Sequence, residues 1–195
     1  MTIAPADIQK LRQQTGVGVL EAKRALEATG GNLTRAATEL RKAGKKIARQ
    51  KSERTTTEGT IGVYVHNNGR VAAMVVLACE TDFVARTDDF RQLAHELAMQ
   101  VAATDPQYLK PADIPSAVVA HEEEIIHQQL RQAGKPATMW SRIVPGKLEK
   151  FYAEVCLLEQ PYIRDDTQSI ADLLNAATAK LGENIQVRRF SRLSL

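Results

Sequence analysis

Two apolar runs joined by a short turn constrain the fold of this chain more than any other feature. The first run covers residues 60–66, and the second extends from Arg70 to Cys79. Asn67-Asn68-Gly69 lies between them and is typical of a β-hairpin turn, because Asn and Gly tolerate the positive φ angles that such turns need. Residues 71–77 are apolar on both faces, so we expect helices to cover at least one side of the second strand.

The residues after the hairpin predict several helices and a closing strand. Apolar side chains recur every three to four residues, as on one face of a helix, in stretches at about 88–104, 116–133, 147–158 and 170–181. A helical segment from Trp140 is expected to break at Pro145-Gly146 before the third stretch resumes. Apolar and polar residues alternate from Ile185 onward, which favours a last strand beside the hairpin. This order predicts an α+β fold with helices covering a three-stranded antiparallel sheet.

The first 44 residues predict a small bundle of three helices. Pro5 suits the first turn of a helix, and Gly16 suits a helix end. A second helix is expected from Val19 to Ala28, and Asn32 can cap a third, which Gly44 would end. A module of this size is near the lower limit for independent stability, and we interpret it as a docking unit.

A basic segment follows the predicted bundle. Residues 41–54 contain seven Lys and Arg residues and one acid, Glu53. Such a run is usually a solvated, partly helical linker, and the alternative is a patch for nucleic acid or an acidic partner. We therefore divide the chain into a docking bundle at 1–44, a basic linker at 45–59 and an α+β core domain at 60–195.

The familiar motifs of catalysis and metal binding are incomplete or missing in this sequence. His121-Glu122-Glu123-Glu124-Ile125 lacks the second His of a zinc-protease helix. The chain contains neither a Gly-x-x-x-x-Gly-Lys-Ser/Thr phosphate loop nor a Gly-x-Ser-x-Gly turn. We therefore predict no catalytic residue, no cofactor and no metal site.

Cysteine usage and hydropathy indicate the compartment. Cys79 and Cys156 lie far apart in apolar runs, which is typical of reduced, buried thiols in a cytosolic protein. No apolar run reaches the roughly 18 residues that a membrane span needs. The N-terminal segment contains Asp7 and has no signal-peptide core. We expect a cytoplasmic protein without a membrane partner.

Three apolar side chains are candidates for exposed contacts. Val19 and Leu20 are consecutive at the start of a helix, so both cannot point into so small a core. Phe83 follows Asp82 on the connection after the second strand, where no helix is expected, and such connections often carry function. From local sequence alone, burial of Phe83 in the core is the more common alternative.

Three segments of the chain match the signatures of one family, in the same order. They are Leu11–Leu26, Cys79–Arg86 and Gly182–Arg189, and the second contains Thr81-Asp82-Phe83-Val84. Together they resemble the bacterial elongation factor Ts family. The resemblance covers essentially the whole chain, and two long signatures in one sequence are highly specific.

The resemblance implies a nucleotide exchange factor for elongation factor Tu. Family members bind elongation factor Tu in its GDP form, release GDP and let GTP enter. An N-terminal bundle, similar to ubiquitin-associated domains, would dock on the partner's GTPase domain through Arg12, Val19 and Leu20. The segment of Thr81, Asp82, Phe83 and Val84 would disturb the partner's magnesium site, with Phe83 wedged between partner helices.

The chain also differs from the longer members of the family that it resembles. Those members resemble two core units in tandem with an added helical hairpin, whereas this chain has one β-hairpin and one closing strand. We therefore expect a homodimer in which a second copy supplies the missing half, using the sheet edge at Ile185–Leu193.

The alternative to an exchange factor is an RNA- or ribosome-associated protein. It would use the basic run Arg41–Arg54 and the C-terminal Arg188-Arg189 to contact phosphates. The exchange-factor interpretation expects no direct contact with nucleic acid.

Overall fold

The hairpin around Asn67-Asn68-Gly69 opens an antiparallel sheet in the computed structural model, which describes residues 3–195. Within those residues the sheet has three strands in the order β1-β2-β5, with β2 in the centre. The strands are β1 (Glu58–Val65), β2 (Val71–Cys79) and β5 (Gln186–Ser194). The predicted α+β class and the closing strand beside the hairpin are therefore confirmed.

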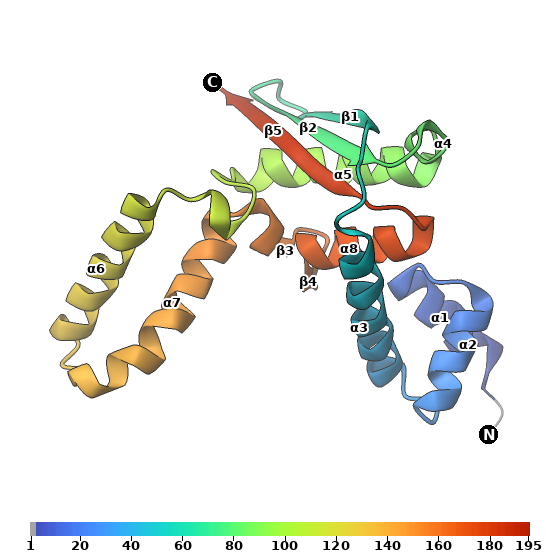
Figure 1. Cartoon of the computed structure of the whole chain (residues 1–195), viewed down its shortest axis with the longest axis horizontal. Helices are drawn as coiled ribbons and strands as arrows, with labels where there is room; N and C mark the ends of the chain where they lie inside the picture. Colours follow the sequence, from blue (N-terminus) through green and yellow to red (C-terminus); the bar gives the residue numbers. More distant parts are fainter. Residues whose placement is uncertain (1–2) are drawn as a thin grey trace.

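The helices lie between and beside these strands in Figure 1. They are α1 (Pro5–Thr15), α2 (Val19–Ala28), α3 (Leu33–Lys51), α4 (Asp82–Ala85), α5 (Asp88–Thr104), α6 (Ser116–Gln132), α7 (Trp140–Val155) and α8 (Ile170–Leu181). A small two-stranded sheet of β3 (Pro161–Tyr162) and β4 (Asp165–Ser169) precedes α8 and was not predicted. Across the described range, no helix is both long and apolar enough to span a bilayer.

The main core lies between the sheet and α5. Phe90 and Leu97 of α5 are fully buried with Val75 and Leu77 of β2. Ile170 at the start of α8 belongs to the same core, and α8 lies beyond α5 from the sheet (Figure 1). Burial of each of these side chains stabilises the fold by about 1.5–3 kcal/mol. The shared core therefore holds β2, α5 and α8 together.

Helix α3 joins the N-terminal bundle to this core. Leu11, Leu26 and Ala36 form a separate buried cluster where α1, α2 and α3 meet. The prediction that Gly44 ends the third helix is wrong, because α3 continues to Lys51. Gly44 is buried where α3 packs on α8, and this packing outweighs the roughly 1 kcal/mol that Gly costs a helix.

The correction changes the nature of the connection between the bundle and the core. Residues 45–51, which were expected to begin a linker, form the last turns of α3. Figure 1 shows α3 as a continuous rod from the bundle to the region beneath the sheet. The two parts of the chain are therefore joined by a helix, and only residues 52–57 run as turn and extended chain before β1.

Helices α6 and α7 pair as a hairpin that points away from the sheet and from the bundle (Figure 1). The predicted break at Pro145-Gly146 is wrong, because Pro145 lies inside a continuous α7. Proline removes one backbone hydrogen bond, and α7 continues through this loss with Pro145 and Gly146 both exposed. Helix α7 ends at Val155, earlier than predicted, where Cys156 forms a β-bridge with Tyr108.

Candidate functional site

The segment after β2 forms a short turn of helix. Asp82–Ala85 is α4, whereas the sequence predicted no helix here. Thr81 caps it, with its hydroxyl oxygen accepting a hydrogen bond from the N–H of Val84 at 3.4 Å. Threonine is a good N-cap because its hydroxyl satisfies an N–H that a helix start leaves free. The cap therefore fixes the segment Asp82–Ala85 as a helical turn, in place of the expected loop.

Phe83 projects from α4 into solvent. Its side chain is 81% exposed, so the alternative in which it folds back into the core is wrong. Asp82 beside it forms an ion pair with Arg86 at 3.0 Å on the surface of the same turn. Proteins normally bury Phe, so its exposure on a capped turn is unusual. The arrangement suits contact with another macromolecule.

A carboxylate from a distant part of the chain holds the start of α4. Oε2 of Glu183 accepts hydrogen bonds from the N–H groups of Glu80 and Thr81, each at 3.0 Å. Oε1 accepts a hydrogen bond from the Thr81 hydroxyl at 2.6 Å. We did not predict Glu183 as a site residue. Its only signal in the sequence was its place in the Gly182–Arg189 signature.

Glu80 and Asn184 form a second hydrogen-bonded contact between the end of β2 and the residues before β5. Oε1 of Glu80 accepts a hydrogen bond from the N–H of Asn184 at 2.7 Å. The buried amide of Asn184 donates in turn to the carbonyls of Ser52 and Arg54, at 3.2 and 2.8 Å. The end of β2, the start of β5 and the residues that follow α3 therefore meet at one hydrogen-bonded junction.

Cys79 lies beneath the same turn and is a structural thiol. Its Sγ donates to the carbonyl of Thr81 at 3.2 Å. Burial raises the pKa of Cys79 to about 11, and the nearby carboxylate of Glu183 acts in the same direction. Burial likewise raises the pKa of Cys156 to about 11. Both thiols are free and buried, as the sequence predicted.

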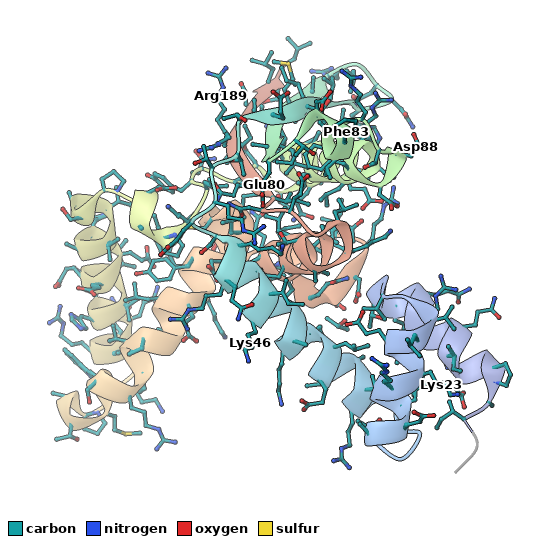
Figure 2. All side chains as sticks on the ribbon, turned by 45° about the vertical axis from the view of Figure 1, so that its right-hand side comes forward. Lys23, Lys46, Glu80, Phe83, Asp88 and Arg189 are labelled. Carbon is teal, nitrogen blue, oxygen red and sulfur yellow. The ribbon has the colours of Figure 1, made fainter. Side chains whose placement is uncertain are left out.

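The residues expected to dock on a partner lie at the other end of α3. Val19 and Leu20 are 55% and 60% exposed at the start of α2. Arg12 of α1 is exposed, and its Nε donates to the carbonyl of Val17 at 3.3 Å in the α1–α2 turn. Figure 2 shows Phe83 near the sheet and Lys23 of α2 toward the opposite end of the molecule. Phe83 and the Val19-Leu20 pair are therefore exposed at separate places on the molecule.

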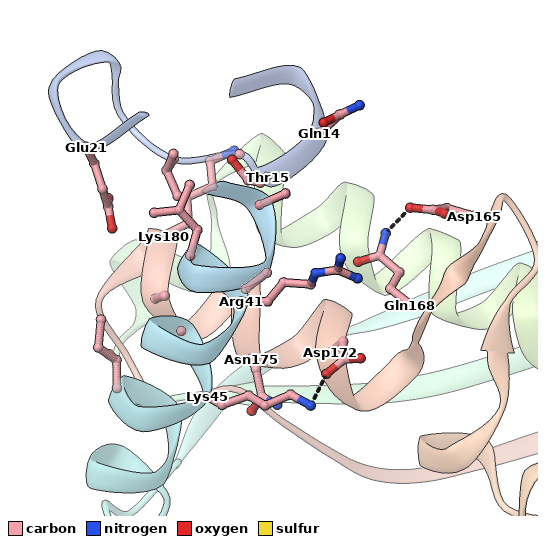
Figure 3. A pocket seen from close by; sticks show the side chains of 18 of the residues that line it. Gln14, Thr15, Glu21, Arg41, Lys45, Asp165, Gln168, Asp172, Asn175 and Lys180 are labelled. Carbon is pink, nitrogen blue, oxygen red and sulfur yellow. Dashed lines mark hydrogen bonds and ion pairs between the residues drawn. The ribbon is translucent and has the colours of Figure 1, made fainter. Parts of the chain in front are cut away.

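A cleft of about 780 Å³ separates the α1–α2 turn from α3 and α8 (Figure 3). Two of its charged groups, Lys45 and Asp172, form an ion pair at 2.8 Å. Burial opposes ionisation of Asp172, but hydrogen bonds from Lys45 and Ser169 hold the pKa of its carboxyl below the ordinary value. Arg41 donates to the carbonyl of Thr167 at 3.1 Å. The cleft is therefore lined by contacts that hold α3 to the core.

Other cations from the two basic segments are also held within the chain. Nζ of Lys51 donates to the carbonyl of Gly182 at 2.6 Å. The guanidinium of Arg188 donates to the carbonyl of Thr56 at 2.9 Å. These contacts tie the two basic segments to the rest of the chain.

Comparison with known proteins decides the family. The family model described as elongation factor TS matches residues 6–181. The chain is 49% identical, over all 195 residues, to elongation factor Ts of Thermotoga petrophila, and the match covers 97% of that protein. It is 48% identical over its full length to elongation factor Ts of Maridesulfovibrio salexigens and of Herpetosiphon aurantiacus, covering 95% and 98% of those proteins. The chain belongs to the elongation factor Ts family.

The resemblance carried by the three signature segments is therefore confirmed. Elongation factor Ts proteins of about this length are found in several organisms, because the match covers 95–98% of the three relatives named above. As a member of this family, the chain is a factor of translation elongation. The exposed turn at Phe83 and the exposed start of α2 lie in two of the segments that carried the resemblance.

Proposed function

We propose that this chain is a guanine-nucleotide exchange factor that binds elongation factor Tu with GDP bound and promotes release of GDP. The observation that carries the proposal is the 81% exposure of Phe83 on a turn fixed to the core at its first residue. Phe83 would insert between helices of the partner, and Thr81, Asp82 and Val84 would border it. Burial of this side chain would supply about 1.5–3 kcal/mol toward the nucleotide-free complex.

The exchange step needs displacement of the partner's backbone and no catalytic group on this chain. Mg²⁺ requires near-ideal octahedral geometry, so a small movement of its ligands weakens its contact with the phosphates. A factor that binds the nucleotide-free partner more tightly must weaken nucleotide binding by the same factor, because the two affinities are thermodynamically linked. Phe83 would provide that preference by fitting only the displaced arrangement.

The N-terminal bundle would supply general affinity. Val19 and Leu20 are exposed, and Arg12 supports the turn that precedes them. We propose that residues 1–44 dock on the partner as a ubiquitin-associated-like unit and that residues 60–195 carry the exchange turn. The continuous helix α3 begins in the bundle and ends close to the core domain. It would therefore fix the distance between the docking residues of the bundle and Phe83 when both contact the partner.

Release of a fluorescent GDP analogue from elongation factor Tu tests this function. The release rate is measured at saturating Mg²⁺ with excess unlabelled nucleotide, over a range of concentrations of this chain. Phe83→Ala should lower the maximal rate by about tenfold or more, because each 1.4 kcal/mol changes a rate by tenfold. Ile163→Ala, at an exposed apolar residue in the β3–β4 turn, is the matched control. An unchanged maximal rate in Phe83→Ala would refute the wedge, and no acceleration by the unmodified chain would refute the function.

We also propose a homodimer built on the sheet. The sheet face opposite α5 exposes a set of apolar residues, namely Ile61, Val63, Val65, Met74 and Leu193. Val63 lies opposite Met74 in the register, so these side chains form one continuous surface. Isolated exposed apolar residues are ordinary, whereas a contiguous patch indicates an interface. Among the described residues, β5 is an edge of the sheet and would extend the same surface.

Sedimentation tests the dimer directly. The chain should sediment as a dimer at micromolar concentration, and Val63→Lys should shift it toward the monomer because a charge would be buried in the interface. Lysine at Thr138, which is exposed near the tip of the α6–α7 hairpin, is the matched control. A monomer under all conditions, alone and with elongation factor Tu, would rule out the dimer.

A further inference from the structure

We propose that Glu183 is a positioning residue that sets the orientation of α4 and thereby aims Phe83 at the partner. This inference rests on the exchange function proposed above and adds a residue to it. Glu183 lies outside the exposed turn, about one hundred positions later in the chain. Its effect on exchange would therefore be exerted through Thr81 and not through contact with the partner.

The contacts of Glu183 determine the direction in which α4 begins. Both carboxylate oxygens are used, one by the N–H groups of Glu80 and Thr81 and the other by the Thr81 hydroxyl. Hydrogen bonds to a charged carboxylate are roughly twice as strong as neutral ones. The peptide before α4 is thus held from two directions, which restricts rotation of the turn relative to the sheet.

Thr81 transmits this constraint to the turn itself. Its hydroxyl donates to Glu183 at 2.6 Å and accepts from the N–H of Val84 at 3.4 Å. One oxygen therefore links the carboxylate of Glu183 to the first hydrogen bond of α4. Because α4 is only four residues long, it has little internal structure with which to hold Phe83 in place.

Asn184 extends the constraint to the docking bundle. Its N–H donates to Glu80, and its side-chain amide donates to the carbonyls of Ser52 and Arg54 just beyond α3. Glu183 and Asn184 are neighbours in sequence, so one short segment contacts both the exchange turn and the end of the connecting helix. The geometry points to a junction that fixes Phe83 relative to Val19 and Leu20 when the chain engages its partner.

The test separates the rate of exchange from binding. GDP release from elongation factor Tu is measured against the concentration of four variants: Glu183→Ala, Glu183→Gln, Phe83→Ala and Glu96→Gln. Glu96 is the matched control, because it is a half-buried carboxylate that accepts hydrogen bonds from Tyr162 and Arg164 instead of from the turn. The melting temperature of each variant and amide hydrogen exchange at Thr81 are measured in parallel.

Glu183→Ala should lower the maximal rate about tenfold, since the charge-assisted contacts to the turn are lost, and should change the half-saturating concentration by less than about threefold. Glu183→Gln should fall between Ala and the unmodified chain, because its amide keeps one oxygen that can accept from the two N–H groups. Amide exchange at Thr81 should be faster in both variants. Combining Glu183→Ala with Phe83→Ala should slow release little beyond Phe83→Ala alone, because both act through the same side chain.

Each alternative outcome has a distinct meaning. A normal maximal rate in Glu183→Ala, with a slow rate in Phe83→Ala, would overturn the positioning role and leave the proposed function intact. Normal rates in both would refute the wedge itself. If Glu183→Ala lowers the melting temperature so far that it is unfolded at the assay temperature, the comparison rests on Glu183→Gln. A folded Glu183→Gln with faster amide exchange at Thr81 and a normal rate would also overturn the proposal.

Discussion

Gly62 of β1 lies directly against the backbone of Ala94 on α5. A Cβ atom built on Gly62 would overlap the carbonyl oxygen of Ala94 and would also meet its Cβ at 3.0 Å. At Gly62, β1 and α5 therefore approach each other more closely than any residue with a side chain would allow. The same helix buries Phe90 and Leu97 against β2, so this approach decides how well the main core closes.

We predict that Gly62→Ala destabilises the protein. The neighbouring atoms belong to the backbone and cannot rotate away, so α5 or β1 must shift, at a cost of about 2 kcal/mol or more. For a chain of this length, that loss corresponds to a fall in melting temperature of roughly 4–8 °C. Thermal and denaturant unfolding followed by circular dichroism would measure it.

Gly44→Ala is the contrasting substitution. A Cβ at Gly44 would lie 3.8 Å from both the Cβ of Ala179 and the carbonyl oxygen of Asn175, which is ordinary contact. Alanine is favoured over glycine inside a helix by about 1 kcal/mol, so this variant should be as stable as the parent or more stable. Equal losses in Gly62→Ala and Gly44→Ala would contradict the steric argument.

Two of the wrong helix predictions concern glycine and proline. Gly44 and Pro145 are residues that normally end or break helices, and local propensity correctly reports their cost. At Gly44, α3 packs on α8, and this tertiary packing outweighs the cost. Pro145 and Gly146 are exposed instead, and α7 continues through them although no neighbouring element packs on Gly146. The hairpin and the closing strand were predictable because their alternation and turn chemistry are local.

The candidate site was predictable only in part, for a similar reason. The signature around Thr81-Asp82-Phe83-Val84 singled out the turn, but the local sequence favoured a buried Phe83. The turn on which Phe83 is exposed is held by the Thr81 cap and by Glu183, which is 102 residues away from Thr81 in the chain. A contact over that separation leaves no periodic pattern, so the contact of Glu183 could not be derived before the fold was known. The Thr81 cap is local, three residues from Val84, and was missed.

We predict that Leu20→Ala weakens binding to elongation factor Tu without lowering the maximal rate of GDP release. Leu20 is exposed at the start of α2, and truncating a side chain that a partner buries removes about 1–2 kcal/mol. The half-saturating concentration should therefore rise about tenfold in the release assay, in contrast to the effect of Phe83→Ala. A lower maximal rate with unchanged half-saturation would assign Leu20 to the exchange step and contradict the division between the two contacts.

We predict that both thiols of the native protein react slowly with alkylating reagents. Burial raises the pKa values of Cys79 and Cys156 to about 11, so at pH 8 only about one thiol in a thousand is the reactive thiolate. Labelling at pH 8 should be at least about a hundredfold slower in the native protein than in denaturant, where the pKa is near 8.5. Ser194→Cys, near the exposed C-terminal end, provides a reactive control, and rapid native labelling at either natural cysteine would contradict the prediction.

The same thiols should lower stability in alkaline solution. A pKa that is raised in the folded state means that the unfolded chain loses its proton first as the pH rises. The contribution of the two protonated thiols to the free energy of unfolding is therefore full below about pH 9 and is lost progressively between about pH 9 and 11. Replacing Cys79 and Cys156 by Ala should flatten this part of the stability profile, measured by urea unfolding at a series of pH values.

The ion pair between Lys45 and Asp172 gives the opposite dependence in acid. The pKa of Asp172 is lowered in the folded state, because hydrogen bonds from Lys45 and Ser169 outweigh burial. The unfolded chain therefore takes up the proton first as the pH falls, and the stability present above about pH 4 is lost below it. Since Lys45 is more than half exposed, solvent screens the pair and we expect a modest contribution.

Lys45→Met tests this pair and the attachment of α3 to α8. The substitution keeps the length of the side chain but leaves the carboxylate of Asp172, whose side chain is 19% exposed, without its cation. The melting temperature at pH 7 should fall by about 2–4 °C, which corresponds to roughly 1 kcal/mol. The difference from the parent should shrink as the pH falls below about 4, because protonation of Asp172 removes the charge that the lysine compensates. Lys42→Met, at an exposed lysine that pairs with Glu39 on the same helix, is the matched control and should change little. A deficit in Lys45→Met that is the same at pH 3 and pH 7 would show that the lysine acts by packing its aliphatic chain, and the ion pair would then have no part in holding α3 on the core.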